Sequence, residues 1–194
     1  MRTRLLAVLL AACAAVPAGA AAPKPQITDP SGDSRVPAAG MDIVSATFST
    51  SGTTAKVRGK KVYTPTKLVV AVTYAGSVAQ DPYATHEVMF QLPSCGEIYL
   101  EVYSGATYGT ADCLTDPFEF SSTVSGSTLT YSVPFGTIGK QYVKPGVALT
   151  DLLVYSAAGD PVIGFESREL TSVMPGVVDG SVDSATTTTA FKIG

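Results

Sequence analysis

The spacing of apolar residues constrains the fold of this chain more than any other feature of its sequence. Apolar and polar residues alternate over short runs, and no long stretch repeats its apolar residues with the period of a helix. In residues 96–104, Ile98, Leu100 and Val102 share one face of a strand, and residues 127–134 alternate in the same way. One face of each strand is therefore expected to pack on a second sheet, while the other meets water or a ligand.

Clusters of glycine, proline, aspartate and serine separate these runs, and no helical pattern lies between them. Many short strands in this order favour an all-β fold over a parallel α/β sheet. We expect an antiparallel β-sandwich with a jelly-roll-like topology. The predicted strands are residues 42–50, 54–58, 67–77, 85–92, 96–104, 117–122, 127–134, 149–156, 161–166 and 186–192.

The first twenty residues have the order of a secretory signal peptide. Arg2 and Arg4 give a positively charged start, residues 5–12 an apolar run, and residues 18–20 a cleavage site of small residues. The apolar run is too short to span a bilayer as a helix. Cleavage after Ala20 would release a secreted, extracellular protein.

The leader also permits a second processing route. Leu10-Ala11-Ala12-Cys13 resembles the lipobox of bacterial lipoproteins, in which Cys13 would be lipidated and become the new N-terminus. Cys13 lies early in the chain for such a motif. Free secretion is therefore the preferred prediction, and a protein lipid-anchored to the cell envelope is the alternative.

The length and charge of the remaining chain limit what it can be. About 170 residues follow the signal peptide at 1–20, enough for one domain with a substantial core. We expect an entry loop over residues 21–40 and a single β-sandwich domain over residues 41–194. Without the two leader arginines, 11 Lys and Arg stand against 16 Asp and Glu, a balance of −5. Such a protein has no electrostatic reason to bind nucleic acid or anionic lipid, and no transmembrane segment is expected.

Two cysteines follow the leader, Cys95 and Cys113, an even number in an oxidising compartment. We expect them to form a disulfide, because two isolated cysteines less often serve a redox or metal site. Closing a loop of about 18 residues stabilises a fold by roughly 3 kcal/mol.

The most specific motif beyond the leader is Asp29-Pro30-Ser31-Gly32-Asp33, and Asp42 follows nine residues later at the start of a strand. Its proline and glycine favour a tight turn that brings the carboxylates together. Hard cations such as Ca²⁺ take several oxygen ligands, whereas Zn²⁺ prefers His and Cys. Asp29, Asp33 and Asp42 are therefore candidate calcium ligands. A turn in which Asp29 and Asp33 accept bonds from backbone amides explains the same residues equally well.

Two later segments belong with this motif: Leu129-Thr130-Tyr131-Ser132-Val133-Pro134, followed by Lys144-Pro145-Gly146, and Asp183-Ser184-Ala185. Together with the entry motif they resemble bacterial secreted β-sandwich domains similar to carbohydrate-binding module family 9 and DOMON-like domains. The resemblance implies a structural Ca²⁺ at the entry loop, with Asp29, Asp33 and Asp42 as ligands and Asp183 as a weaker fourth. Membership of such a group fixes no single activity.

One strand carries a polar and aromatic strip on its outer face. Glu97, Tyr99, Glu101 and Tyr103 share this face, and Tyr108 follows inside the loop that the cysteines close. The strip is a weak candidate for binding a carbohydrate, because the chain has no Trp, the strongest aromatic platform for a sugar. We prefer the interpretation as an ordinary solvent-exposed strand face, on which Tyr is favoured by its β propensity.

Five basic residues lie within twelve positions, from Lys56 to Lys67. The preferred interpretation is a solvated edge strand, where Lys also opposes aggregation. On a hairpin, the same residues would form a basic patch for an acidic polymer.

The sequence offers no catalytic constellation. The single histidine, His86, lies mid-chain in a predicted strand, so no Ser-His-Asp order arises. Glu97 and Glu101 are roughly 13 Å apart along one strand, too far for a glycosidase pair. We therefore expect a non-enzymatic, secreted binding or cell-envelope module whose partner is a polysaccharide or another envelope component. A structural or protein-interaction sandwich without a small ligand is the alternative, and a secreted hydrolase comes third.

Overall fold

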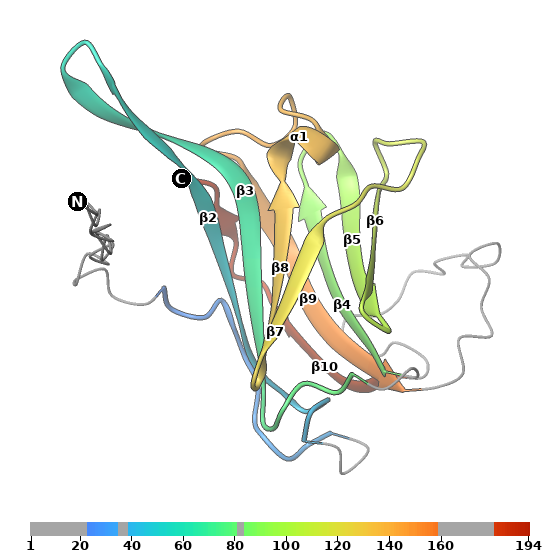
Figure 1. Cartoon of the computed structure of the whole chain (residues 1–194). Helices are drawn as coiled ribbons and strands as arrows, with labels where there is room; N and C mark the ends of the chain where they lie inside the picture. Colours follow the sequence, from blue (N-terminus) through green and yellow to red (C-terminus); the bar gives the residue numbers. More distant parts are fainter. Residues whose placement is uncertain (1–22, 35–38, 81–83, 159–180) are drawn as a thin grey trace, which may run out of the picture.

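The computed structural model describes residues 23–34, 39–80, 84–158 and 181–194 (Figure 1). The predicted leader with Cys13 and the predicted strand at 161–166 lie outside the described residues. The described chain forms two antiparallel sheets that pack against each other, which confirms the predicted all-β sandwich. None of its helices is long and apolar enough to cross a membrane.

The first sheet has the order β1-β2-β3-β8-β7, and the second has the order β10-β9-β4-β5-β6, with β11 also paired to β9. Consecutive strands form most of the pairs, while β3–β8 and β4–β9 join distant parts of the chain. The jelly-roll topology stays a prediction. The strands are β1 (Ile27–Thr28), β2 (Ile43–Val57), β3 (Lys60–Tyr74), β4 (Ala84–Leu92), β5 (Gly96–Tyr103), β6 (Ala106–Ala111), β7 (Ser121–Ser125), β8 (Thr128–Pro134), β9 (Ala148–Ala158), β10 (Ser181–Thr187) and β11 (Phe191–Lys192), and one short helix, α1 (Phe135–Ile138), follows β8.

The core lies between the two sheets and contains the residues that the alternating pattern places on the inner faces. Ile98, Leu100 and Val102 of β5 are all buried, as predicted. Phe48 from the first sheet meets Phe90 from the second edge to face, with ring centroids 6.3 Å apart. Burying apolar side chains of this size contributes about 1.5–3 kcal/mol each, which makes this layer the main source of stability.

Several predicted boundaries differ from the structure. Residues 42–50 and 54–58 belong to the one long strand β2, and β3 begins at Lys60 instead of residue 67. The strand β6 was not predicted, and β10 starts at Ser181, before the strand predicted over residues 186–192. These segments are rich in Ser, Thr and Lys, so backbone pairing and not apolar alternation makes them strands.

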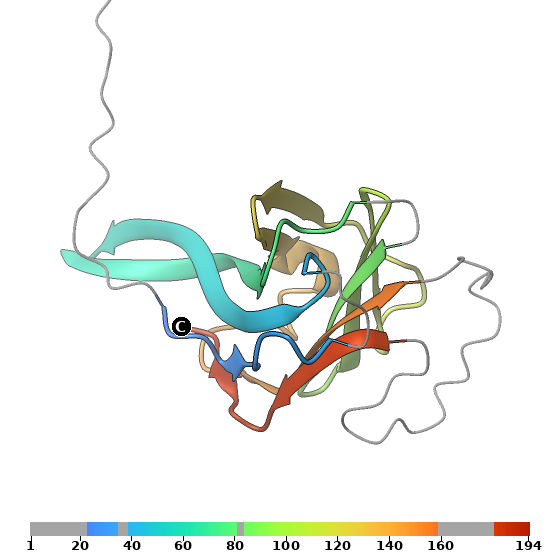
Figure 2. The same ribbon diagram turned by 90° about the horizontal axis from the view of Figure 1, so that it is seen from below.

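The hairpin of β2 and β3 extends beyond the body of the sandwich (Figures 1 and 2). We call its outer part, residues 52–65, the arm. A register shift at Ser51/Gly52 marks its base. A Cβ atom on Gly52 would lie 2.1 Å from the carbonyl oxygen of Thr64, so only glycine permits the strands to approach there. The bulge and the glycine separate the arm from the rest of the sheet.

The predicted disulfide between Cys95 and Cys113 is confirmed, with Cα atoms 4.7 Å apart. It joins the turn before β5 to the residues that follow β6. The bridge therefore closes the β5–β6 hairpin at its open end.

Candidate metal centre

The entry loop is held beside the first sheet by two hydrogen bonds, one to a backbone carbonyl and one to a side chain. The Asp29 N–H donates to Val44 O at 2.9 Å, in continuation of the β1–β2 pairing. The turn then passes through Gly32, whose φ of 94° is readily adopted only by glycine. The Gly32 N–H donates to Asp42 Oδ2 at 2.7 Å. These bonds fold the loop into a turn, with Asp29 on one side of it and Asp33 on the other.

Asp183 reaches the same place from the second sheet. It lies in β10, beside the register shift at Ser181/Asp183. The Ser184 N–H donates to its Oδ1 at 2.8 Å, and the Ile43 N–H donates to its Oδ2. Asp183 therefore joins the start of β2 to β10 across 140 residues of sequence.

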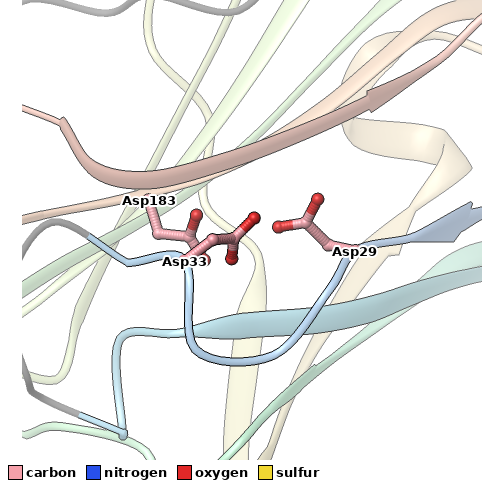
Figure 3. Close-up of side chains that lie close together, drawn as sticks. All are labelled: Asp29, Asp33 and Asp183. Carbon is pink, nitrogen blue, oxygen red and sulfur yellow. The ribbon is translucent and has the colours of Figure 1, made fainter.

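Three carboxylates converge at this point. One oxygen each from Asp29, Asp33 and Asp183 lies within 4.8 Å of the others, and Figure 3 shows the three side chains turned toward one another. Among the described residues this is the one group of His, Cys, Asp and Glu with the spacing of metal ligands. Asp183 was the weakest of the four predicted ligands, yet the structure places its carboxylate in this group.

Asp42 lies beside this group, and its assignment as a calcium ligand stays a prediction. Its Oδ2 accepts the Gly32 N–H, and the Ser31 hydroxyl lies 3.5 Å from the same oxygen. It is 6 % exposed and is absent from the group of three. Asp42 thus holds the loop in place, while its charge still acts on Asp29 and Asp183.

Among the described residues, the negative charges of the group act against one another. Burial, followed by the charges of Asp183, Asp33 and Asp42 in that order, raises the pKa of Asp29 to about 6. Burial also raises the pKa of Asp183, with bonds from the Ile43 and Ser184 N–H groups acting against it and the charges of Asp33 and Asp42 adding to it. Among the groups that shift these two pKa values there is no lysine or arginine of the described chain.

Two carboxylate oxygens in this region are also buried without a hydrogen-bond partner in the described chain, namely Asp29 Oδ2 and Asp42 Oδ1. A buried, ionised oxygen without a partner is costly unless a cation or a proton compensates it. The donor set is all oxygen and contains neither His nor Cys, which suits Ca²⁺ and does not suit Zn²⁺.

The polar and aromatic strip is half-buried. Glu97, Tyr99, Glu101 and Tyr103 all lie on β5 at intermediate exposure, and Tyr108 on β6 stands opposite Glu101. Burial, followed by the charge of Asp112, raises the pKa of Glu97. The strip is therefore less open than a solvated strand face, and carbohydrate binding there stays a prediction.

Sequence patterns did not point to two further side chains beside this strip, Glu87 and Tyr155. Glu87 on β4 stands opposite Glu101, and the Tyr155 hydroxyl from β9 donates to Glu87. The hydroxyl oxygens of Tyr155 and Tyr99 are 3.4 Å apart. The register between strands brings these side chains together. The residue pattern of a single strand therefore could not predict their contact.

A cavity of about 310 Å³ lies between the sheets near His86. The His86 Nε2 is 2.8 Å from Ala79 O, and the ring meets Tyr74 edge to face at 5.0 Å. The other described lining residues are apolar or uncharged, among them Val78, Val102 and Leu129. The cavity thus offers no second titratable side chain of the described chain to assist His86.

Comparisons with protein-family models, with curated proteins and with solved structures gave no match to this chain. Its function is therefore argued from the residues of the site.

Proposed function

We propose that this protein is an exported, non-catalytic binding module of the cell envelope, stabilised by a structural Ca²⁺ at Asp29, Asp33 and Asp183. The convergence of three carboxylates from the entry loop and β10 carries the proposal, and no lysine or arginine of the described chain is among the groups that shift the pKa of Asp29 or Asp183. Ca²⁺ would supply a positive charge that the described residues do not, and loop carbonyls and water complete such a site in proteins.

The position of the centre suits a structural role. Asp29 and Asp33 belong to the entry loop on the first sheet, whereas Asp183 belongs to an edge strand of the second. Figure 2 shows the entry segment beside β10. A cation held by these residues would connect the two sheets at their shared edge, and its binding free energy would add to the stability of the fold.

The remaining parts of the proposal rest on the sequence. The leader supports export, with cleavage after Ala20 or lipidation of Cys13 as the two routes. A carbohydrate ligand is supported by the resemblance to secreted β-sandwich modules and by the tyrosines of the strip.

The calcium site is tested by thermal unfolding of the protein with EDTA and with millimolar Ca²⁺. We expect Ca²⁺ to raise the melting temperature of the wild type by several degrees, because the ion binds only the folded state. Asp33→Asn should abolish this increase. The matched control is Asp116→Asn, an exposed aspartate on another loop, which should keep it. An equal increase in wild type and Asp33→Asn would refute the site.

A further inference from the structure

The arm is the longest run of exposed residues in the described chain, and it lies outside the packed layers of the sandwich. Beyond Gly52, β2 pairs only with β3, while β3 pairs with β8 only from Lys67 onward. Nearly every residue of the arm is exposed, including Val57 at 53 %, Val62 at 42 % and Tyr63 at 41 %. A two-stranded ribbon alone in water is marginally stable, so its residues indicate contact with something outside the molecule.

The arm concentrates positive charge on an otherwise acidic protein. Lys56, Arg58, Lys60 and Lys61 lie at its tip, and residues 43–80 contain no Asp or Glu. With Lys67 this segment holds five of the 13 basic residues, which leaves eight against 16 acidic residues for the rest of the chain, a balance of −8. The arm is thus the part of the surface that attracts an anionic partner.

Two features of the tip are unfavourable for the hairpin by itself. Lys56 and Lys61 are direct cross-strand partners, and like charges in this position destabilise a sheet. Arg58 adopts a φ of 49° in the turn before Gly59, where asparagine is the usual choice. Unfavourable charge pairs and backbone conformations of this kind are typical of functional sites. An anion bound between the cations would offset their repulsion.

An aromatic ring accompanies the lysine pair. Tyr63 pairs with Thr54, two residues from the Lys56–Lys61 pair, so its side chain projects from the same face of the ribbon. Its hydroxyl donates to Thr50 O at 3.1 Å, which holds the side chain along the arm. Cations beside an exposed aromatic ring can bind an acidic group and the apolar face of the sugar that carries it.

We propose that the arm binds an anionic polysaccharide. Its lysine pair and Arg58 bind the carboxylate or phosphate groups, and Tyr63 packs against a sugar ring. The choice of an envelope polymer rests on the proposed function, because it assumes an exported protein. The arm itself is independent of the calcium centre.

The test uses the whole exported protein and measures its binding to three immobilised polymers at low and high NaCl concentration. Polygalacturonate carries carboxylates, dextran phosphate carries phosphate groups on a sugar chain, and dextran is neutral. The variant Lys56→Gln/Lys61→Gln removes the pair, and Lys140→Gln/Lys144→Gln removes two exposed lysines elsewhere as a control with the same change in net charge. A third variant, Tyr63→Thr, removes the ring.

We expect the wild type to bind at least one polyanion, with weaker binding at high salt, and to leave dextran unbound. Lys56→Gln/Lys61→Gln should weaken binding roughly tenfold or more, the control double variant by less than about twofold, and Tyr63→Thr by an intermediate factor. The lysine variant should melt no lower than the wild type, because it removes a like-charge pair. The stronger of the two polyanions identifies carboxylate or phosphate as the preferred group.

Three results would overturn the proposal: no binding of either polyanion at low salt, equal weakening in both double variants, or self-association of the protein that Lys56→Gln/Lys61→Gln abolishes. The last result would assign the arm to a second copy of the acidic body. A wild type that binds polyanions but does not respond to Ca²⁺ in thermal unfolding would refute the calcium centre and leave the arm proposal standing. A calcium response without polymer binding would refute the arm proposal and leave the calcium centre standing.

Discussion

Asp29 shows at the residue scale how ionisation at the proposed calcium centre is linked to stability. It is half-buried, three other carboxylates act on it, and its Oδ2 has no hydrogen-bond partner in the described chain. The proton is therefore held more tightly in the folded protein than in the unfolded chain, with a pKa of about 6 against 3.8. The folded state thus favours either a proton or a cation at this position.

In the metal-free protein, the contribution of Asp29 to stability should decrease as the pH rises from about 4 to about 6. The raised pKa means that the folded state binds more protons than the unfolded state in this range, so the free energy of unfolding decreases with pH. After solvent screening we expect an effect of about 1 kcal/mol. Denaturant unfolding at pH 4 and pH 7 measures it: Asp29→Asn should gain about this amount over the wild type at the higher pH. A gain that is the same at both pH values would contradict the account.

Tyr131 gives a second prediction at this scale, in the core. Its ring is fully buried and stacks on Phe120 at 5.8 Å, while its hydroxyl has no hydrogen-bond partner among the described residues. Tyr131→Phe removes a buried polar group that gains nothing from folding, so stability should stay equal or rise by up to about 1 kcal/mol. Tyr155→Phe is the matched comparison, because that hydroxyl donates to Glu87, and it should cost about 1–3 kcal/mol. Destabilisation by both substitutions in denaturant unfolding would show that Tyr131 has a partner.

At the scale of elements, strands with apolar alternation were predictable, and strands formed mainly by backbone pairing were not. The runs at 85–92 and 127–134 agree closely with β4 and β8, because each buries one apolar face. By contrast, β6 and β10 consist largely of Ala, Thr and Ser and form the two edges of the second sheet. An edge strand needs fewer apolar residues, so its sequence carries a weaker signal.

The β5–β6 hairpin depends on the disulfide at its open end. The bridge closes a loop of 18 residues, and its removal by Cys95→Ser/Cys113→Ser should lower the free energy of unfolding by roughly 3 kcal/mol. Equilibrium unfolding in denaturant checks this value. Adding a reductant to the wild type should produce a similar loss, and the double variant should not respond to the reductant. A variant as stable as the oxidised wild type would contradict the prediction.

At the scale of the whole molecule, the proposed calcium centre and the arm depend on how the sheets are assembled. The entry motif indicated a metal site, and its tight turn is present, but no local pattern could show that Asp183 joins it from the far end of the chain. Nor could the sequence show that Asp42 turns toward Gly32. The charge run was visible in the sequence, while its position on a projecting hairpin depends on the bulge at Gly52.

Calorimetric titration of the metal-free protein with Ca²⁺ tests the central claim most directly. The account predicts one Ca²⁺ per chain, with the modest affinity of extracellular sites, on the order of 10⁻⁴–10⁻³ M, and no binding by Asp33→Asn/Asp183→Asn. Asp116→Asn should bind as the wild type does. The absence of binding heat in the wild type, or unchanged binding by the double variant, would contradict the calcium centre.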